Sequence, residues 1–430
     1  MTERRNYMNH NSGLVERRED APYQLQTPLV VPPAGNGLQS KTGYKFHVDS
    51  TNEFSTPLDW GGAYLAIDYV VKKKADGLNC AAADNIAVAG DGYSLIRRID
   101  FKWAGKPTTD KNDQSNEVIN LSNKFTYSGD YLNEATVTGF YPDSGTGAPD
   151  IATNTGFAIR QKLVVEAATP SLILPLNRYP FIRAAVQRLY PTGKLDIDIT
   201  LADDNAILFR DGAAADGKVF VTRMELYVPR LTITDMGREA FSEAMDAPQE
   251  WTYQQNTTYS SQNLQQSKGT YTIDNLQQRP RIVVVYAADI DVDSVQTKNS
   301  YHYKTYSVGG DAQPTSVHLT VASNERYPEN SYNVASDKPR IYKDFLMMSH
   351  KFEDFNKGSF LSKELFEATS PAFVFDLRNQ RSDLFKQSVK LELRYVLDKV
   401  PANAFQWRAV VFYDQEIGTE VIGNKVELRA

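Results

Sequence analysis

The chain has very few residues of the kinds that build metal sites and nucleophilic active sites. It contains one cysteine, Cys80, and five histidines in 430 residues. A single cysteine excludes an internal disulfide and a cysteine-rich zinc site. No histidine lies within a few residues of another, and there is no HExxH, GxSxG, P-loop or GxGxxG motif. We therefore predict no catalytic residues, no cofactor-binding residues, no cofactor and no metal, and we expect that the protein is not an enzyme.

The chain also lacks long apolar runs and an excess of basic residues. No run of 18 apolar residues is present, so no membrane-spanning helix is expected, and the polar first residues are not expected to act as a signal peptide. The formal net charge is −6, with lysine and arginine spread along the sequence. Strong nucleic-acid binding is therefore not expected. These absences predict a protein that is made inside the cell.

What the sequence does have is many aromatic residues and strands that alternate with a period of two. It contains 24 tyrosines and 20 phenylalanines, which suits packed sheets. The most informative stretch is 171–234, where Leu195, Ile197 and Ile199 alternate with Asp196 and Asp198. This spacing places the aliphatic side chains on one face of a strand and the carboxylates on the other. A second long strand is predicted at 219–228.

A similar order of elements returns near the C-terminus. The apolar segments 172–177 and 373–378 are each followed by a short insert around a phenylalanine. Alternating strands follow at 194–201 and 389–396, and each copy ends in a loop and a hydrophobic strand. Few residues are identical, so the pattern is repeated rather than the sequence. Any two β-sandwich domains share alternating strands, but the matched order favours duplication.

The repeat divides the chain into two halves of ordinary domain size. We predict a flexible N-terminal arm at 1–41, a first domain at 42–234, a helical linker at 235–248 and a second domain at 249–430. Short strands separated by Gly, Asn and Asp turns, with few helices, are typical of a sandwich. The predicted fold is all-β, with two tandem jelly-roll domains, each an eight-stranded antiparallel sandwich, and a few short helices.

Local patterns predict individual elements within these domains. Alternation and apolar character predict strands, whereas near-helical spacing predicts a helix at 341–358 beside the linker helix. The segments 104–155 and 293–340 are expected to be long surface loops, the first with a short helix within 120–135. The further predicted strands are 64–73, 94–105, 156–167, 281–292, 301–310 and 316–323.

Several weak chemical signals have simpler structural explanations. Cys80 is interpreted as a small buried thiol rather than a nucleophile. Asp196 and Asp198 could bind a cation together with Asp203 and Asp204, but a solvated strand face is the preferred interpretation. The tyrosines of the loops could stack on sugars, although interface or core positions are favoured. The arginines of the arm are nearly balanced by acids, which indicates a solvated tail.

At 171–234 the chain resembles the double jelly-roll major capsid proteins of polinton- and adintovirus-like DNA viruses. Gly105 and Lys106 match a small turn at a strand tip, and the resemblance extends over roughly residues 55–430. The sequence departs from the family at the Pro191-Thr192-Gly193 insertion and lacks an acid–Leu–Leu motif. The segments that carry the resemblance are 68–77, 98–109, 125–135, 180–209, 221–234 and 280–288.

The resemblance implies a structural role and no catalytic residues. It implies homotrimers in which six similar sandwiches form a pseudo-hexameric capsomer of an icosahedral DNA virus shell. The implied partners are the chain itself, neighbouring capsomers, and penton and minor capsid proteins, with the arm contacting an internal membrane or the genome. The implied location is the virion capsid, assembled inside the host cell. The alternatives are a carbohydrate-binding β-sandwich protein and a minor or vertex capsid protein.

Overall fold

The structure is a computed structural model of the 430-residue chain. Its description covers fourteen stretches of the chain, and every structural statement below refers to them. These are residues 23–31, 43–49, 57–108, 115–145, 148–165, 168–185, 193–212, 216–233, 249–276, 279–321, 325–349, 358–379, 389–422 and 425–429.

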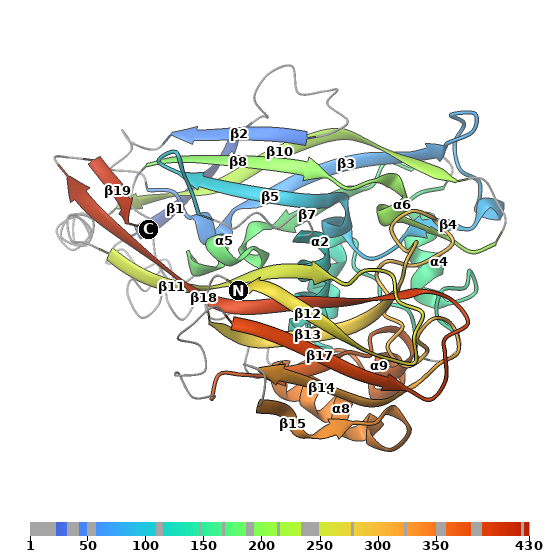
Figure 1. Ribbon diagram of the computed structural model, residues 1–430. Helices are drawn as coiled ribbons and strands as arrows, with labels where there is room; N and C mark the ends of the chain where they lie inside the picture. Colours follow the sequence, from blue (N-terminus) through green and yellow to red (C-terminus); the bar gives the residue numbers. More distant parts are fainter. Residues whose placement is uncertain are drawn as a thin grey trace.

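The first half of the chain forms an antiparallel sandwich, called the first sandwich from here on (Figure 1). One sheet has the strand order β1-β10-β3-β7, and the other has the order β2-β8-β5-β6. A short ladder of β4 and β9 lies beside them. The strands are β1 (Tyr23–Val31), β2 (Gly43–Asp49), β3 (Tyr64–Lys73), β4 (Ile86–Val88), β5 (Ile96–Trp103), β6 (Lys106–Pro107), β7 (Ser171–Pro175), β8 (Lys194–Leu201), β9 (Leu208–Arg210) and β10 (Gly217–Ile233).

The second half forms a second sandwich with the same order of strands. One sheet has the order β11-β18-β13-β16, with β19 paired to β18, and the other has the order β12-β17-β14-β15. The strands are β11 (Gln249–Ser260), β12 (Lys268–Leu276), β13 (Pro280–Asp289), β14 (Pro314–Val321), β15 (Glu325–Tyr332), β16 (Phe373–Asp376), β17 (Val389–Leu397), β18 (Phe405–Ile422) and β19 (Lys425–Arg429).

The two sandwiches therefore have one topology, and the repeat seen in the sequence occupies the same place in each. Strands β7, β8 and β10 of the first sandwich correspond to β16, β17 and β18 of the second. In β8, Leu195, Ile197 and Ile199 are buried, while Asp196 and Asp198 are partly exposed. The period-two pattern thus placed the aliphatic residues in the core as predicted. The predicted fold class, two tandem jelly rolls of eight antiparallel strands, is confirmed.

Helices lie mainly in the connections between the two sheets of each sandwich. In the first half, α2, α3 and α4 lie between β6 and β7, and in the second half α8 and α9 lie between β15 and β16. None of these helices is long and apolar enough to cross a membrane. The helices are α2 (Ser115–Thr126), α3 (Leu132–Ala135), α4 (Thr155–Lys162), α5 (Pro180–Ala184), α6 (Asp204–Ile207), α8 (Val334–Ser349) and α9 (Lys363–Thr369).

Two predicted strands are wrong. The segment 156–167 begins as helix α4, because the Asn154 side chain accepts a hydrogen bond from Gly156 N (3.2 Å) and caps the first turn. The segment 301–310 forms turns, and Asn299 Oδ1 accepts from Tyr301 N (2.9 Å) at their start. In the second segment, buried tyrosines imitate the alternation of a strand although their neighbours belong to turns.

The arm and the two long loops also differ from expectation. Residues 23–31 of the predicted flexible arm form β1, which pairs antiparallel with β10 along the edge of the first sandwich. The segment 104–155 contains the buried helix α2, and the segment 293–340 contains β14, β15 and the start of α8. The polar segment 249–276, which was not predicted as strands, forms β11 and β12.

Of two predicted helices, one is not tested and the other is tested in part. The linker helix predicted at 235–248 lies outside the described residues. The helix predicted at 341–358 is α8, but it begins at Val334 and its last described residue is Ser349. Its buried residues Ile341, Phe345 and Met348 face the core of the second sandwich. The spacing of apolar residues therefore located this helix but not its first turns.

Candidate functional site

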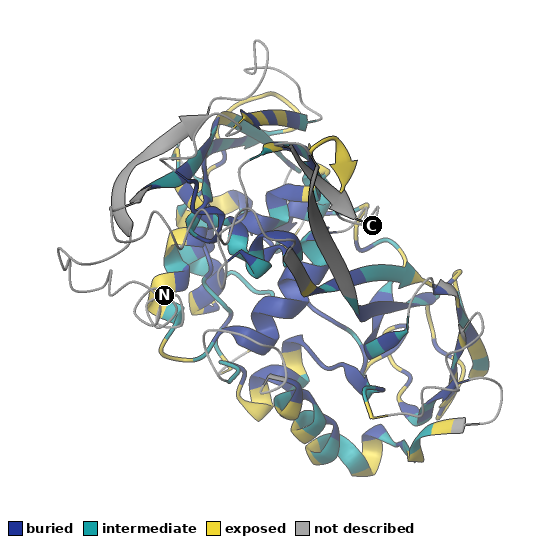
Figure 2. Ribbon diagram, turned by 90° about the vertical axis from the view of Figure 1, so that its left-hand side faces the viewer, coloured by how far each residue is buried: buried dark blue, intermediate teal, exposed yellow. Residues whose placement is uncertain are grey.

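The feature that sets this molecule apart from two linked domains is the contact region between the sandwiches. We call it the seam, and it consists of the described residues of 115–160 from the first half and of 293–303 and 358–361 from the second, together with Tyr253 and Arg408. Figure 1 shows α2 lying between the two sets of strands, and buried residues run from one sandwich to the other through the middle of the molecule in Figure 2. The seam is the site on which the functional argument rests.

Helix α2 belongs to the first half by sequence but completes the core of the second. Val118, Leu121 and Phe125 are at most 2% exposed and lie in the second core. The ring of Phe125 stacks on that of Phe345 in α8, with centroids 4.5 Å apart. Ile119, on another face of the helix, packs in the first core. The helix is therefore buried on more than one side, which explains why its sequence is apolar at helical spacing.

A smaller contribution runs in the opposite direction. Tyr253 of β11, in the second half, is buried in the first core. Its ring meets Phe181 of α5 edge to face, with centroids 6.1 Å apart. Its hydroxyl donates a hydrogen bond to the carbonyl oxygen of Thr108. Each sandwich thus buries side chains from the other half of the chain.

Aromatic residues from both halves form a third, smaller core inside the seam. Phe140 meets Phe360 edge to face, with centroids 5.3 Å apart, and also contacts Tyr127. The backbone crosses as well, since Phe360 N donates to Tyr127 O at 2.6 Å. The buried members are Ala87, Ala89, Tyr127, Ala135, Phe140, Phe157, Phe209 and Tyr301.

Lys124, near the end of α2, is fully buried in the seam. Its ammonium donates to Tyr301 O at 2.5 Å and lies over the Tyr303 and Tyr301 rings, 3.7 and 4.4 Å from their centroids. The rings and the carbonyl stabilise a charged ammonium, but no carboxylate contacts it. Burial therefore lowers the pKa of Lys124 well below its usual value, and the charge of Asp150 opposes this only in part.

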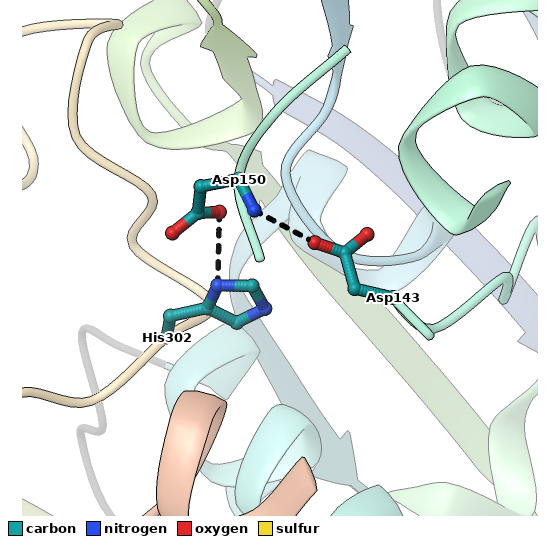
Figure 3. Close-up of side chains that lie close together, drawn as sticks. All are labelled: Asp143, Asp150 and His302. Carbon is teal, nitrogen blue, oxygen red and sulfur yellow. Dashed lines mark hydrogen bonds and ion pairs between the residues drawn. The ribbon is translucent and has the colours of Figure 1, made fainter. Parts of the chain in front are cut away.

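Asp143, Asp150 and His302 form a polar cluster at the same junction (Figure 3). The Asp150 carboxylate lies 2.9 Å from His302 Nδ1, and the Asp143 carboxylate accepts from Asp150 N at 3.0 Å. Asn299 Nδ2 also donates to Asp150, at 2.6 Å, and Arg160 pairs with Asp143 at 2.9 Å. The cluster joins a loop of the first half to a loop of the second.

The electrostatics of this cluster favour an ionised Asp150. Burial alone would raise the pKa of Asp150, but His302, as a charge and as a hydrogen-bond donor, together with Asn299, holds it well below its usual value. An ionised carboxylate only accepts hydrogen bonds, so Nδ1 of His302 carries the proton in this contact. The pair therefore acts as an electrostatic clasp between the halves.

The same three residues are the only group in the described chain whose carboxylate and imidazole atoms come together closely enough for a metal, within 4.8 Å of one another. Their hydrogen bonds are directed elsewhere: Arg160 and Asp150 N occupy Asp143, and His302 and Asn299 occupy Asp150. A guanidinium in contact with one ligand also repels a cation. The donor set is therefore satisfied as a hydrogen-bonded network, and we assign it a structural role.

A third polar link connects α2 to β18. Arg408 lies between two acids, with Nη1 at 3.4 Å from Glu117 and Nη2 at 2.5 Å from Asp293. Tyr286 also donates to Glu117. Arg408 and Glu117 are nearly buried, so a guanidinium that contacts two carboxylates is well suited to the position. The seam thus combines apolar packing with three separate polar contacts.

The residues singled out from the sequence lie away from the seam or are already paired. Cys80 is buried, as predicted, and burial raises the pKa of its thiol to about 11. On β8, Asp196 pairs with His47 (2.8 Å) and Asp198 with Lys102 (2.6 Å). Asp204 instead accepts from Val219 N (2.8 Å), so these acids do not converge on one cation.

The seam residues were missed because no motif marks them. Contacts between positions as distant as 150 and 302 have no signature in a single sequence. One signal was available: Val118, Leu121 and Phe125 are spaced as on one face of a helix. The tyrosines at 127, 301 and 303, considered for sugar stacking, are at most 7% exposed. Their burial agrees with a core or interface position for these three tyrosines, whereas Tyr131 and Tyr141 are partly exposed.

Comparisons with known proteins identify the fold and go no further. No family model matches the sequence, and no curated protein matches it. Among solved structures, the Sputnik virophage cryo-EM structure has a TM-score of 0.60 at 11% identity, covering 94% of this chain and 88% of that one. The fold is the double jelly roll of viral major capsid proteins.

Two further structures support the same conclusion. PBCV-1 VP54, fitted into a reconstruction of Sputnik, has a TM-score of 0.55 at 10% identity and covers 96% of this chain and 98% of that one. The Faustovirus major capsid protein has a TM-score of 0.54 at 10% identity, with coverage of 92% and 90%. The double jelly roll thus extends over nearly the whole chain, with both sandwiches included.

Proposed function

We propose that this chain is a major capsid protein that forms homotrimeric, pseudo-hexameric capsomers of an icosahedral DNA virus shell. The observation that supports this most strongly is the presence of two sandwiches of identical topology joined by a buried seam. Three such chains around a threefold axis present six similar sandwiches, and a near-hexagonal outline allows neighbouring units to pack into a closed shell.

The seam is what makes this geometry reproducible. Six near-equivalent positions require that the two sandwiches of each chain keep one mutual orientation. A flexible linker alone would leave that orientation free, whereas α2, the Asp150–His302 clasp and the Arg408 link hold both halves together. Because interiors pack densely, small rotations at such a contact are disfavoured. The chain is therefore suited to serve as a rigid subunit of a capsomer.

The proposal includes partners and a location. The chain contacts two further copies of itself, neighbouring capsomers, and the penton and minor capsid proteins that close the shell. It is assembled inside the host cell and resides in the virion. The N-terminal arm contacts an internal membrane or the genome. We assign the protein to the polinton- and adintovirus-like lineage and propose no enzymatic activity.

Purified protein provides the direct test. We expect trimers by light scattering and native mass spectrometry, and hexagonal particles or shells by electron microscopy. Protein that remains monomeric at all micromolar concentrations tested would contradict the trimer. A matched variant with Asp130→Asn, at an exposed position, should assemble like the wild type. Trimers that never form hexagonal arrays would point instead to a minor capsid role.

The alternative carbohydrate-binding function is less well supported. It requires aromatic rings that are accessible at the surface, but the loop tyrosines at 127, 301 and 303 are buried in the seam. A glycan array checks this function independently of assembly. The vertex alternative is also less well supported, because two like sandwiches per chain suit a threefold assembly with near-sixfold symmetry. A pentamer in native mass spectrometry would revive it.

A further inference from the structure

The sheet β11-β18-β13-β16 of the second sandwich has an outer face that is covered within the chain. Tyr286 and Arg408 are paired in its ladder, and both contact Glu117 of α2. Because side chains alternate along a strand, every second residue from these two lies on the same face. The apolar residues of this face are all at most 6% exposed, and they are Ile282, Val284, Val374, Val410 and Phe412.

The corresponding face of the first sandwich is not covered, and we call it the open face. It belongs to the sheet β1-β10-β3-β7, in which β3, β7 and β10 correspond to β13, β16 and β18. Leu172 and Leu174 are buried in the first core, so Ile173 between them points outward. Ile173 and Val374 each lie two residues before the last paired residue of their strand. Ile173 is 42% exposed, whereas Val374 is 6% exposed.

An arginine occupies the same place on both faces. Arg408 of β18 pairs with Tyr286 of β13 in the ladder, and Arg223 of β10 pairs in the same row with Asp68 of β3. The Arg408 side chain is 10% exposed, where it contacts Glu117 of α2. The Arg223 side chain is 46% exposed and forms its ion pairs within its own sheet. The two faces thus carry the same side chain, covered in one sandwich and accessible in the other.

Apolar and aromatic side chains make the open face suitable for a protein contact. The rings of Tyr64 and Tyr227 stack across β3 and β10, with centroids 5.0 Å apart, and both residues are partly exposed. Val137, in a short helical turn that contacts β7, is 48% exposed. Tyrosine and arginine are the residues enriched at the centres of protein interfaces. The open face therefore combines Ile173, two tyrosines and an arginine in one patch.

We propose that the open face is covered by the second sandwich of another copy of this chain. The inference rests on the proposed capsomer, in which six similar sandwiches form a ring and contacts within a chain alternate with contacts between chains. Near-sixfold symmetry requires that both kinds of contact use equivalent surfaces. Within the chain, the covered sheet receives α2, which lies in the connection between β6 and β7 of the other sandwich.

The same rule identifies the part of the neighbouring copy that makes the contact. The connection equivalent to that of α2 lies between β15 and β16 and contains α8 and α9. In α8, Phe345 and Met348 are buried in the second core, but Met347 between them is 45% exposed. Met347 thus presents an apolar side chain on the outer side of this helix. We assign α8 of one copy as the contact for the open face of the next.

Two variants at equally exposed apolar positions test this assignment. Ile173→Lys places an unpaired ammonium in the proposed contact, so the concentration at which half of the protein is trimeric should rise about tenfold or more in sedimentation velocity. Val396→Lys, at a 43% exposed position in β17, is the matched control and should assemble like the wild type. The circular dichroism spectra of all three proteins should agree. Unchanged assembly of Ile173→Lys, or an equal loss in both variants, would overturn the proposal.

Hydroxyl-radical footprinting of the wild type tests the open face without a substitution. Oxidation of Tyr64 and Tyr227 should fall several-fold in the trimer relative to protein diluted to the monomer. Unchanged oxidation of both tyrosines in a protein that trimerises would overturn the contact but leave the proposed trimer standing. A wild-type protein that never trimerises would instead contradict the proposed function and the contact together.

Discussion

The two sandwiches share a topology but complete their cores differently. In each, helices are inserted between the fifth and sixth of the eight jelly-roll strands, that is, between β6 and β7 and between β15 and β16. In the second sandwich the inserted helix α8 folds back against its own strands β14 and β16. In the first sandwich the inserted helix α2 crosses to the other half and contacts α8 there. The same connection thus packs on its own strands in the second sandwich, whereas in the first sandwich it links the two halves of the chain.

Because of this difference, the two cores rely to unequal extents on side chains from the other half of the chain. The second core receives Val118, Leu121 and Phe125 from the first half, whereas the first core receives Tyr253 in return. Three apolar side chains bury more area than one tyrosine, and each contributes about 1.5–3 kcal/mol on burial. The second sandwich should therefore lose more when the seam is disrupted. The predictions below test this asymmetry, starting with the largest expected effect.

Phe125→Ala should have the largest effect and should act on the second sandwich. Removing a buried phenylalanine costs about 3–5 kcal/mol, because transfer free energy is lost and a cavity remains. Hydrogen exchange read by mass spectrometry should accelerate in β13 and β14 before it accelerates in β3 and β8. Phe46→Ala, in the first core, is the matched control and should reverse this order. Faster exchange confined to the first sandwich in the Phe125 variant would refute the asymmetry.

Asp150→Asn should loosen the clasp without removing apolar contacts. Truncating one partner of a buried ion pair costs about 3–5 kcal/mol, and Asp150 is partly exposed, so we expect a loss near the lower limit. The pKa of Asp150 is held low in the folded state, so its stabilising contribution is present above pH 3.8 and is lost as the pH falls below that value.

Denaturant unfolding as a function of pH measures this contribution. Wild-type stability should fall more steeply than that of the variant below pH 3.8, and the two curves should converge. The exposed Asp130→Asn is the control and should follow the wild type. Parallel curves for the wild type and Asp150→Asn would show that the Asp150 carboxylate makes no pH-dependent contribution to stability.

Lys124→Met should stabilise the protein by about 1 kcal/mol at neutral pH, because an apolar chain replaces a buried amine with no counter-charge. The Tyr301 carbonyl keeps the Asn120 amide as a donor. The pKa of Lys124 lies below 10.5 in the folded state. Wild-type stability therefore rises as the pH increases from that folded-state pKa to 10.5, and the advantage of the variant shrinks toward pH 10.5. Lys162→Met, on the exposed side of α4, should show no pH-dependent gain.

The alternation of single strands was enough to predict most of the architecture. Strands β3, β5, β8, β10, β13 and β14 were located because each has one face in a core, so local sequence reports its burial. The repeated order of elements then indicated two sandwich or jelly-roll domains, and the resemblance to the capsid family specified the double jelly roll. The seam could not be found in this way, since the pairing of residue 150 with residue 302 depends on how the sandwiches dock. Segment 301–310 was misread because buried tyrosines alternate in it although they lie in turns: Tyr301 packs in the small core between the sandwiches, and Tyr303 stacks on Tyr286 of β13.

Asp198→Asn on the outer face of β8 should have the smallest effect, and it contrasts an exposed polar contact with the buried ones of the seam. Asp198 contacts Lys102 at 2.6 Å, and both side chains reach solvent. Exposed pairs of this kind contribute less than about 1 kcal/mol and are weakened by salt. The Tm should therefore change little and the difference should vanish at high salt.

Calcium or EDTA should leave the Tm unchanged, because Asp196 and Asp198 are paired with His47 and Lys102 rather than directed at a common cation. A rise in Tm with calcium that Asp198→Asn abolishes would instead reveal a cation site on this face.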